Sequence, residues 1–473
     1  MVFSSFVFLL AFLLIVLFLH YICPGRGRNV VLLVASLIFY AWGEPVYVLI
    51  MLFSTVFDYT NGILIEHFQK KNCPGKAKVV LIIDLCGNLG ILGFFKYADF
   101  FIGNLNTITG AGLSLLHIAL PIGISFYTFQ TMSYTIDVYR KVVPAQHNIL
   151  NFATYVTLFP QLIAGPIVQY KTVAKELAHR KVSLEDFSEG AFRFSIGLAK
   201  KVLLANQIGS LWNTISQLHQ MSAATAWLGA IAYSFQIYFD FSGYSDMAIG
   251  LGRMFGFHFL ENFNFPYMSK TITEFWRRWH ISLSSWFREY VYIPLGGNRK
   301  GIFRTVFNLL VVWALTGLWH GASWNFMLWG IYFFVFIAAE KLLLSRLLSK
   351  NRAVSHIYLL IIVFFGWILF RFESLSDVWC VIRGMFGANG NPLSSFEAFT
   401  TVKSYVIMLI IAVLACTPIF KNLTDRLKFG ALKSRGALAA YSVAQLIVPA
   451  VLLIISAAAL VGDSYNPFLY FRF

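Results

Sequence analysis

The chain has 473 residues, of which 58% are hydrophobic and only 12% charged, and its mean hydropathy is +0.69. Soluble domains carry about 25% charged residues, so the composition excludes a soluble protein and predicts an integral membrane protein. The net charge of +16 fits the positive-inside rule better than nucleic-acid binding, because the Lys and Arg clusters lie in short loops. These clusters fall at 26–28, 70–78, 140–141, 171–193, 277–304, 341–352 and 421–435.

Uncharged runs along the chain predict the membrane-spanning segments. A helix needs roughly 20 apolar residues to cross a hydrocarbon core of about 30 Å, so the longer runs hold two elements or extend beyond the bilayer. They predict roughly a dozen helical spans, and no period-2 alternation suggests a barrel. The runs are 2–25, 100–136, 202–239, 305–339, 353–370, 404–420 and 436–462, with interrupted segments at 29–66 and 79–96.

The charge pattern also predicts the orientation of the chain. With every basic loop in the cytoplasm, both termini lie outside, and the segments 148–170 and 271–295 enter and leave on the same side. The first of these contains "LFPQLIAGPIVQY", whose prolines and glycine favour a re-entrant segment over an unbroken crossing. The polar stretch 171–202 is typical of interfacial helices. The loop at about 371–402 is the longest outward loop and is turn-like.

We therefore expect one membrane domain over 1–473. It comprises N-terminal spans (1–147), re-entrant and interfacial helices (148–201), a core with the candidate chemistry (202–345), and C-terminal spans with an outward tail (346–473). The five cysteines form no C-x-x-C pair and indicate neither a disulfide framework nor a metal site. Because G-x-S-x-G, H-E-x-x-H, Walker A and G-x-G-x-x-G motifs are absent, a serine-hydrolase mechanism is not indicated.

His320 lies in "WALTGLWHGASWNFMLWG", inside a run from 305 to 339 without any Lys, Arg, Asp or Glu. Helical pieces at about 305–318 and 324–339 flank "TGLWHGAS", which predicts a hairpin or broken helix that carries the imidazole at membrane depth. Ionisable groups there are costly and usually face a cavity or the bundle interior. A functional histidine is therefore favoured over a structural one bonded to a carbonyl.

A second candidate is His280, in "TITEFWRRWHISLSSWFREYVYIPLGGN". Apolar residues recur at helical spacing from 272 to 290, so His280 is expected within an aromatic helix, with Trp276 and Ser284 one turn away on either side. The "PLGGN" after it predicts a sharp turn. An interfacial helix with an aromatic belt explains the stripe but gives no reason for the histidine.

A third stretch, "SFQIYFDFSGYSDMAIG", ends an apolar run with Asp240, Ser242, Tyr244 and Asp246. Two interpretations are equally weighted. The polar residues line a vestibule or bind a cationic group, or they cap a span at the membrane interface.

The two histidine motifs, "RRWHISLSSWFREYVYIPLGGN" and "LTGLWHGASWNF", resemble the membrane-bound O-acyltransferase (MBOAT) superfamily. They are most similar to its bacterial branch, which contains the alginate O-acetyltransferase membrane subunit and related polysaccharide and peptidoglycan acetylation proteins. "FDFSGYSDMAIG" and the terminal "NPFLYFRF" are also similar to that branch. The resemblance implies an all-α ring of helices around a thinned membrane centre with a tunnel.

It also implies acyl transfer from a cytoplasmic thioester, on coenzyme A or a carrier protein, to a hydroxyl acceptor. No cofactor or metal is expected to be bound permanently. The essential histidine of the family matches His320, and its second signature residue matches His280. The first is expected to act as general base, and the second to orient or polarise the thioester carbonyl. The residues expected to line the substrate tunnel are Trp319, Asn325, Ser323, Trp276, Ser284, Asp240 and Asp246.

The implied role is export of an acyl group, most simply acetyl, to an extracellular polysaccharide or cell-wall polymer from the cytoplasmic (inner) membrane. The expected partners are a secreted or anchored O-acetyltransferase on the outer side, the thioester donor and membrane lipids. D-alanyl transfer to teichoic acid by a related branch is the nearest alternative. A secondary transporter with a histidine proton relay is a further one, but it predicts two related halves and no second copy of "TGLWHGAS" is found.

The C-terminal "NPFLYFRF" resembles the end of a small accessory protein of teichoic-acid D-alanylation, in which a tyrosine is implicated as an acyl relay. By position, Tyr470 is the matching hydroxyl. The alternative is that the aromatic residues of this tail only anchor it at the outer membrane interface.

Overall fold

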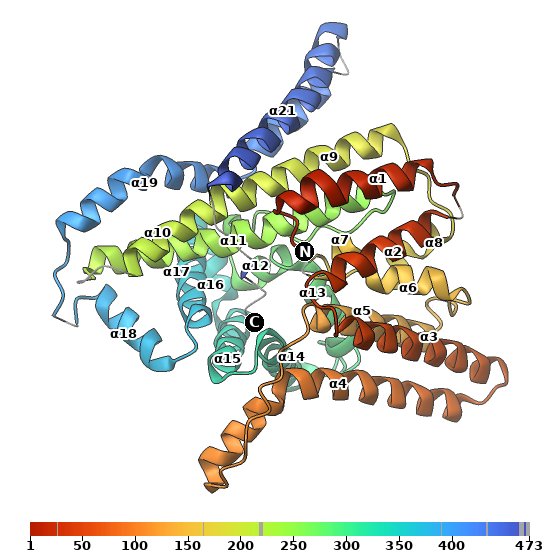
Figure 1. Ribbon diagram of the computed structural model, residues 1–473. Coiled ribbons are helices and arrows are strands. Elements are labelled where there is room, and N and C mark those ends of the chain that lie inside the picture. Colours follow the sequence, from red (N-terminus) through yellow and green to blue (C-terminus); the bar gives the residue numbers. More distant parts are fainter. Residues whose placement is uncertain are drawn as a thin grey trace. The chain divides into compact units, whose positions relative to one another are not determined.

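The computed structural model describes residues 1–25, 27–163, 165–216, 221–388, 390–431, 434–462 and 468–469. Helices and connecting loops account for all of these residues, and no strand occurs among them (Figure 1). The expected all-α class is therefore confirmed.

Within the described residues, seven helices are long and apolar enough to cross a membrane. They are α3 (Val48–Lys70), α4 (Pro74–Thr109), α14 (Gly301–His320), α15 (Trp324–Ala339) with its continuation to Lys350, α17 (Arg352–Arg371), α19 (Phe396–Ala415) and α21 (Arg435–Val461). Two shorter apolar segments are Val7–Ile22 and α2 (Arg28–Ala41). Some of the uncharged runs are divided: the run 100–136 holds the end of α4, the loop 110–123 and most of α5 (Ile124–Tyr139).

The chain forms two compact units. Unit 1 contains residues 1–194, 247–261 and 285–291. Besides α2 to α5 it includes η1 (Val7–Phe12), α1 (Leu13–Ile22), α6 (Ile149–Thr157), α7 (Phe159–Leu162), α8 (Tyr170–Ala178) and most of α9 (Leu184–Ala199).

In unit 1, α3, α4 and α5 pack against one another, and Figure 1 shows α3 and α4 side by side. The segment expected to be re-entrant is indeed interrupted, since α6 ends before Leu158 (φ −52°, ψ 109°) and the four-residue α7 has Pro160 in its first turn. Asn148 caps α6 by accepting the amide protons of Leu150 and Asn151. Helices of nine and four residues are too short to span a bilayer.

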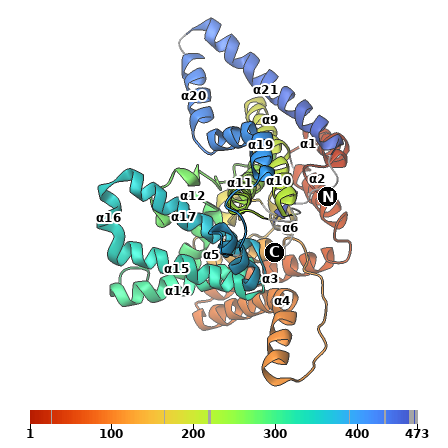
Figure 2. The same ribbon diagram turned by 90° about the vertical axis from the view of Figure 1, so that its left-hand side faces the viewer.

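Unit 2 contains residues 195–246, 262–284 and 292–473. Besides α14, α15, α17, α19 and α21 it includes η2 (Lys200–Asn206), α10 (Gln207–Ser216), most of α11 (Ala223–Met254), η3 (Pro266–Met268), α12 (Ile272–Arg278), the start of α13 (Ile281–Phe287), η5 (Glu340–Leu344), α16 (Ser345–Lys350), α18 (Leu375–Met385) and α20 (Ile419–Ala431). The last turn of α13 and most of η4 (Arg288–Tyr292) belong to unit 1. Figure 2 shows α20 and α21 as a helical hairpin.

Two glycines allow the α14–α15 hairpin to pack closely. A Cβ atom on Gly330 would lie 2.3 Å from the carbonyl oxygen of Trp313, and one on Gly317 would lie 2.4 Å from that of Phe326. Small residues let helix backbones approach each other in membrane proteins. The hairpin predicted around "TGLWHGAS" is therefore present. Its two helices pack backbone against backbone at Gly317 and Gly330.

The structure differs from the sequence-based predictions in two places. The stretch 371–402, predicted to be a loop, contains the helix α18 and the start of α19, and Gly387 and Gly390 between them are at positive φ. The aromatic stripe from 272 to 290 is not one helix, because it breaks at Trp279 and His280 into α12 and α13. The predicted turn at "PLGGN" is present, with Gly296 and Gly297 at positive φ.

Candidate active site

His320 is the last residue of α14, and the chain then turns through an extended Gly321 (φ −175°, ψ 161°) before α15 begins. Glycine is required at 321 because a Cβ atom there would lie 2.3 Å from the ring of Phe326. The imidazole is 4% exposed, and its ring centroid lies 5.0 Å from Trp319, 4.9 Å from Trp329 and 5.2 Å from Phe370. The break thus places a titratable ring among aromatic side chains.

His280 sits in the break between α12 and α13, with φ +45°, a left-handed conformation that is unfavourable for a non-glycine residue. The prediction that His280 lies within a helix is therefore wrong. The N-terminus of α12 is fixed by two side chains. Thr271 accepts the amide proton of Glu274, and the buried Glu340 accepts those of Ile272 and Thr273. A carboxylate at a helix N-terminus is electrostatically favourable.

Asn262 holds the ring of His280. Its Oδ1 accepts the backbone N–H of Ser282 (3.2 Å) and the Ser282 hydroxyl (2.9 Å), and lies 3.2 Å from His280 Nδ1. Its Nδ2 donates to Ser245 Oγ (2.9 Å). Because the backbone N–H can only donate, the atom that faces the imidazole is an oxygen, so Nδ1 carries the proton.

Burial and this hydrogen-bond network together set the charge and the tautomer of His280. Burial lowers the pKa of His280 to about 3, so its imidazole is neutral at working pH. With the proton on Nδ1, the lone pair is on Nε2, which accepts a hydrogen bond or a proton and does not donate to a carbonyl oxygen.

The two histidines flank the same indole. The ring centroid of Trp319 lies 5.8 Å from His280 and 5.0 Å from His320, and all three side chains are at most 4% exposed. On the other side of His320, Trp329 packs against Trp276, with ring centroids 5.4 Å apart. The structure thus brings both predicted histidines and both predicted tryptophans into one cluster, which we call the aromatic chamber (Trp276, His280, Trp319, His320, Trp329 and Phe370).

Two indole N–H donors of this chamber, those of Trp276 and Trp329, have no hydrogen-bond acceptor among the described residues. The same holds for the buried side-chain amide of Asn325, five residues after His320 in the chain. An unsatisfied buried donor costs about 1–3 kcal/mol, and in native proteins such a group calls for a specific explanation. A substrate oxygen that enters the chamber would satisfy them.

Two of the residues predicted to line the tunnel, Ser284 and Ser323, form hydrogen bonds within the protein. The hydroxyl of Ser284 donates to the carbonyl oxygen of Trp276 (3.0 Å) and ties α13 to α12. The hydroxyl of Ser323 bonds the side-chain oxygen of Asn325, and Ser323 precedes the first residue of α15.

Asp240 and Asp246 lie inside α11 and not at its end, so they do not cap a span. Asp240 forms a buried ion pair with Lys201, and Asp246 pairs with Lys200 at 2.7 Å. Phe241, next to Asp240, packs edge-on against His280 with ring centroids 4.7 Å apart. Both carboxylates therefore pair with lysines of the same chain.

The C-terminal tail reaches the same part of α11. The backbone N–H of Leu469 donates to Asp240 Oδ2 (2.8 Å), and the buried Phe468 stacks on Tyr244 with ring centroids 4.9 Å apart. Phe468 also packs against Phe241, at 5.6 Å. Tyr470, the residue predicted as an acyl relay, lies outside the described residues.

Among the described residues, no group of three or more His, Cys, Asp or Glu side chains could hold a metal ion. Of the histidines considered structural, His258 bonds Glu176 and Asp186, His147 bonds Glu66, and the Nδ1 of His356 donates to the carbonyl oxygen of Ser269.

Comparison with known proteins finds similarity over the part of the chain that contains both histidine motifs. The MBOAT, membrane-bound O-acyltransferase family, matches residues 139–378, the part of the chain that contains both His280 and His320. The chain is also 41% identical to the "Probable alginate O-acetylase AlgI" of Azotobacter vinelandii, with 100% of each chain covered. The chain belongs to the membrane-bound O-acyltransferase family. It is therefore a multi-pass membrane protein and an acyltransferase.

Two further relatives carry other names. A "Peptidoglycan O-acetyltransferase" of Helicobacter pylori is 34% identical, with 83% of this chain and 81% of that protein covered. A "Teichoic acid D-alanyltransferase" of Bacillus subtilis is 28% identical, with 45% of this chain and 56% of that protein covered.

Three residues at the site were not identified from the sequence: Asn262, Lys201 and Glu340. Each is a polar residue beside an apolar segment, and no spacing links Asn262 to His280, 18 residues later, or Glu340 to α12. Their roles depend on contacts between distant parts of the chain, which local patterns do not encode.

Proposed function

We propose that this enzyme moves an acetyl group from a cytoplasmic thioester, on coenzyme A or an acyl carrier protein, to a hydroxyl acceptor for O-acetylation of an extracellular polysaccharide or cell-wall polymer. The observation that carries the proposal is the aromatic chamber, where His320 and His280 flank Trp319 beside three N–H donors without acceptors. The cytoplasmic membrane, with both termini outside, is the location that the positive-inside rule favours.

In the proposed reaction His320 is the general base. Its imidazole takes the proton from the acceptor hydroxyl as that oxygen attacks the thioester carbonyl carbon. The C–S bond breaks, and the leaving thiolate receives the proton from His320. The products are an acetyl ester and the free thiol, and the histidine returns to its starting form.

The donors of Trp276, Trp329 and Asn325 suit the oxyanion that develops on the carbonyl oxygen. Preorganised donors of this kind typically contribute a factor of about 10²–10³ each to the rate of acyl transfer. We assign the carbonyl-polarising role expected of His280 to these groups, because the neutral His280 offers a lone pair at Nε2. His280 then accepts a hydrogen bond from an amide N–H of the donor.

The acceptor hydroxyl inside the membrane is proposed to be that of Tyr470. The supporting observation is the preceding residue, Leu469, whose amide is held by Asp240 one position away from Phe241, a direct neighbour of His280. A secreted or membrane-anchored O-acetyltransferase would then take the acetyl group from the tyrosyl ester to the polymer.

Acetyl is favoured over D-alanyl by the comparisons. The two acetylating relatives described above match 100% and 83% of this chain at 41% and 34% identity, whereas the D-alanyltransferase of Bacillus subtilis matches 45% of it at 28%. Supplying purified protein with acetyl-coenzyme A and with a D-alanyl-carrier protein tests this directly.

The proposal is tested with protein reconstituted in vesicles, supplied with radiolabelled acetyl-coenzyme A. For wild type we expect acetyl release from the donor and an acetyl adduct on Tyr470 by mass spectrometry. The His320→Ala variant should lose about 10²–10⁴-fold in rate, while His67→Ala, on an exposed position at the end of α3, should not. Tyr470→Phe should lose the adduct. Near-normal transfer by His320→Ala would contradict the proposed base.

A further inference from the structure

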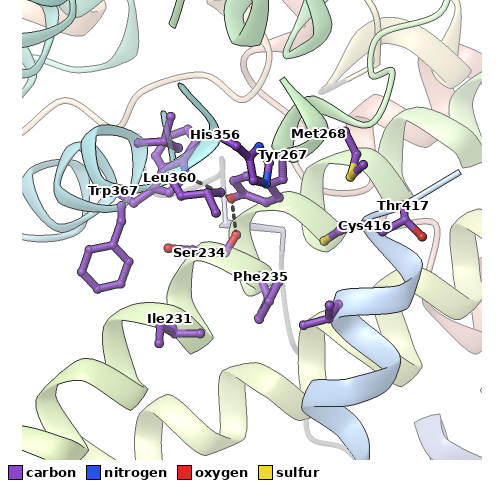
Figure 3. A pocket seen from close by; sticks show the side chains of 13 residues that line it. Ile231, Ser234, Phe235, Tyr267, Met268, His356, Leu360, Trp367, Cys416 and Thr417 are labelled. Atoms are coloured by element: carbon purple, nitrogen blue, oxygen red, sulfur yellow. Dashed lines mark hydrogen bonds between the residues drawn. The ribbon is translucent and has the colours of Figure 1, made fainter. Parts of the chain in front are cut away.

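A pocket of about 300 Å³ lies in unit 2 (Figure 3), and one of its lining residues, Trp367, also packs against Phe370 of the aromatic chamber with ring centroids 5.9 Å apart. Its walls come from α11, η3, α17 and the end of α19, with Phe235, Tyr267, Leu360, Trp367, Val413 and Cys416 among the lining residues. One buried water needs only about 10–15 Å³ by a comparable measure. The pocket is therefore a binding-sized space and not a packing defect.

The polar side chains of the wall already donate their protons within the protein. Tyr267 donates to the carbonyl oxygen of Ser234 (2.6 Å) and accepts from the Trp367 indole (3.0 Å), as Figure 3 shows. The hydroxyl of Ser234 donates to Ala230 O (2.9 Å). Thr417 and His356 likewise donate to backbone carbonyl oxygens.

A polar ligand would therefore find few hydrogen-bond partners in this pocket. Water would be disfavoured for the same reason, because buried water is stable only where it makes about two to four hydrogen bonds. The wall fits a hydrocarbon chain.

The rim of the pocket is exposed on membrane-spanning helices. Val413 on α19 is 52% exposed and Leu360 on α17 is 39% exposed, and both helices are long and apolar enough to cross the bilayer. Exposed apolar side chains on such helices contact lipid. A chain of a bilayer lipid can thus enter from the side without leaving the hydrocarbon phase.

Exposed cationic residues lie close in sequence to the segments that form the pocket. An exposed Lys or Arg lies within four residues of a lining residue on three elements: Lys270 after Met268, Arg352 before His356, and Lys421 after Thr417. The neighbouring Glu274 is engaged by Arg278 (2.8 Å). Clustered basic residues beside a membrane span attract anionic lipid headgroups.

We propose that this pocket binds one acyl chain of an anionic phospholipid, with the headgroup phosphate held by Lys270, Arg352 and Lys421. Lipid binding here does not rest on the proposed acetyl transfer, although Trp367 also contacts residues next to the two histidines. The floor of the pocket, Trp367, packs against Trp279 with ring centroids 4.7 Å apart, so the bound lipid would support the break that carries His280.

Native mass spectrometry of the detergent-purified protein, with added dioleoyl phosphatidylglycerol or dioleoyl phosphatidylcholine, tests the proposal. We expect one phosphatidylglycerol to be retained per chain. Val413→Trp fills the pocket and should weaken retention by at least about tenfold, the change expected when two buried methylene groups are displaced. Ile407→Trp, on an exposed position of α19 that does not line the pocket, should retain the lipid.

A second measurement does not depend on a variant that must fold. Cys416 is the only cysteine among the lining residues, and phosphatidylglycerol should slow its labelling by N-ethylmaleimide, followed by peptide mass spectrometry. Equal retention by Val413→Trp, or equal protection by phosphatidylcholine, would overturn the proposal. Displacement of the lipid by acetyl-coenzyme A would also overturn it and would assign the pocket to the acyl donor.

Discussion

The proton on His280 is located by a backbone amide. Ser282 N–H can only donate, so Asn262 must present its oxygen to the imidazole, and the lone pair of His280 is then on Nε2. Two seven-residue helices meet at this left-handed residue, whose backbone costs roughly 1–2 kcal/mol relative to a right-handed one. The hydrogen bonds that Asn262 Oδ1 accepts from Ser282 and His280 offset that cost.

Substitutions of Asn262 should separate positioning from folding. Asn262→Leu removes the oxygen and should lower the rate of acetyl transfer by roughly 10–100-fold, as loss of a partner that orients a functional histidine does. Asn262→Asp keeps an acceptor and adds a charge that favours the protonated imidazole, so the pKa of His280 should rise.

Activity that needs neutral His280 would then be lost at higher pH in Asn262→Asp than in wild type. The measurement is the pH–rate profile of both proteins between about pH 5 and 8. An unchanged acid limb in Asn262→Asp would show that Asn262 does not control the imidazole.

At the scale of elements, the α14–α15 hairpin is the most predictable part of the site. A charge-free run with a Gly-Ala-Ser break after one histidine was enough to place His320 between two helices. The break at His280 was missed because aromatic spacing continues across it, and periodicity does not register a single left-handed residue. The partners Asn262 and Glu340 are far away in sequence and became visible only in the fold.

Packing at the glycine contact should decide whether the chamber forms. Gly330→Ala places a methyl group 2.3 Å from the Trp313 carbonyl oxygen, and overpacking of this kind costs typically about 1–3 kcal/mol. We expect a lower unfolding temperature in detergent and reduced acetyl transfer. The matched control is Gly90→Ala on α4, where a Cβ atom meets nothing within 4 Å. If both variants unfold at the wild-type temperature, the close approach does not hold the hairpin.

At the scale of the whole molecule, composition predicted the class and the charge pattern predicted the interrupted segments. Neither pattern predicted how the chain is divided into two compact units, since α11 and α13 each contribute to both units. An uncharged run also need not be one span, because the run 100–136 contains the loop 110–123. Hydropathy predicts whether a residue lies in an apolar environment, but it does not predict where the backbone leaves a helix.

Stability of the whole protein should depend on pH through His258. Burial alone lowers the pKa of His258, but hydrogen bonds to Glu176 and Asp186 outweigh it, and the pKa is raised above 6.5. Hydrogen bonding from Ser183 and then from His258 lowers the pKa of Asp186. The histidine contribution is full below about pH 6.5 and is lost as the pH rises through the raised value, while that of Asp186 is lost in acid.

His258→Gln should therefore lower the unfolding temperature more at about pH 5.5 than at about pH 8.5. Differential scanning fluorimetry of the purified protein at the two pH values measures this, with His67→Gln as the control. A destabilisation that is the same at both values would show that the ion pairs of His258 do not contribute.

The central claim is that His320 and His280 act on one chemical step in one chamber. The most direct test is a double-mutant cycle in single-turnover acetyl transfer, with His320→Ala, His280→Ala and the double variant. Groups that act as a unit are strongly non-additive, so we predict that the double variant is scarcely slower than His320→Ala alone. Losses that multiply would contradict the account, because they would mean that the two histidines serve independent steps.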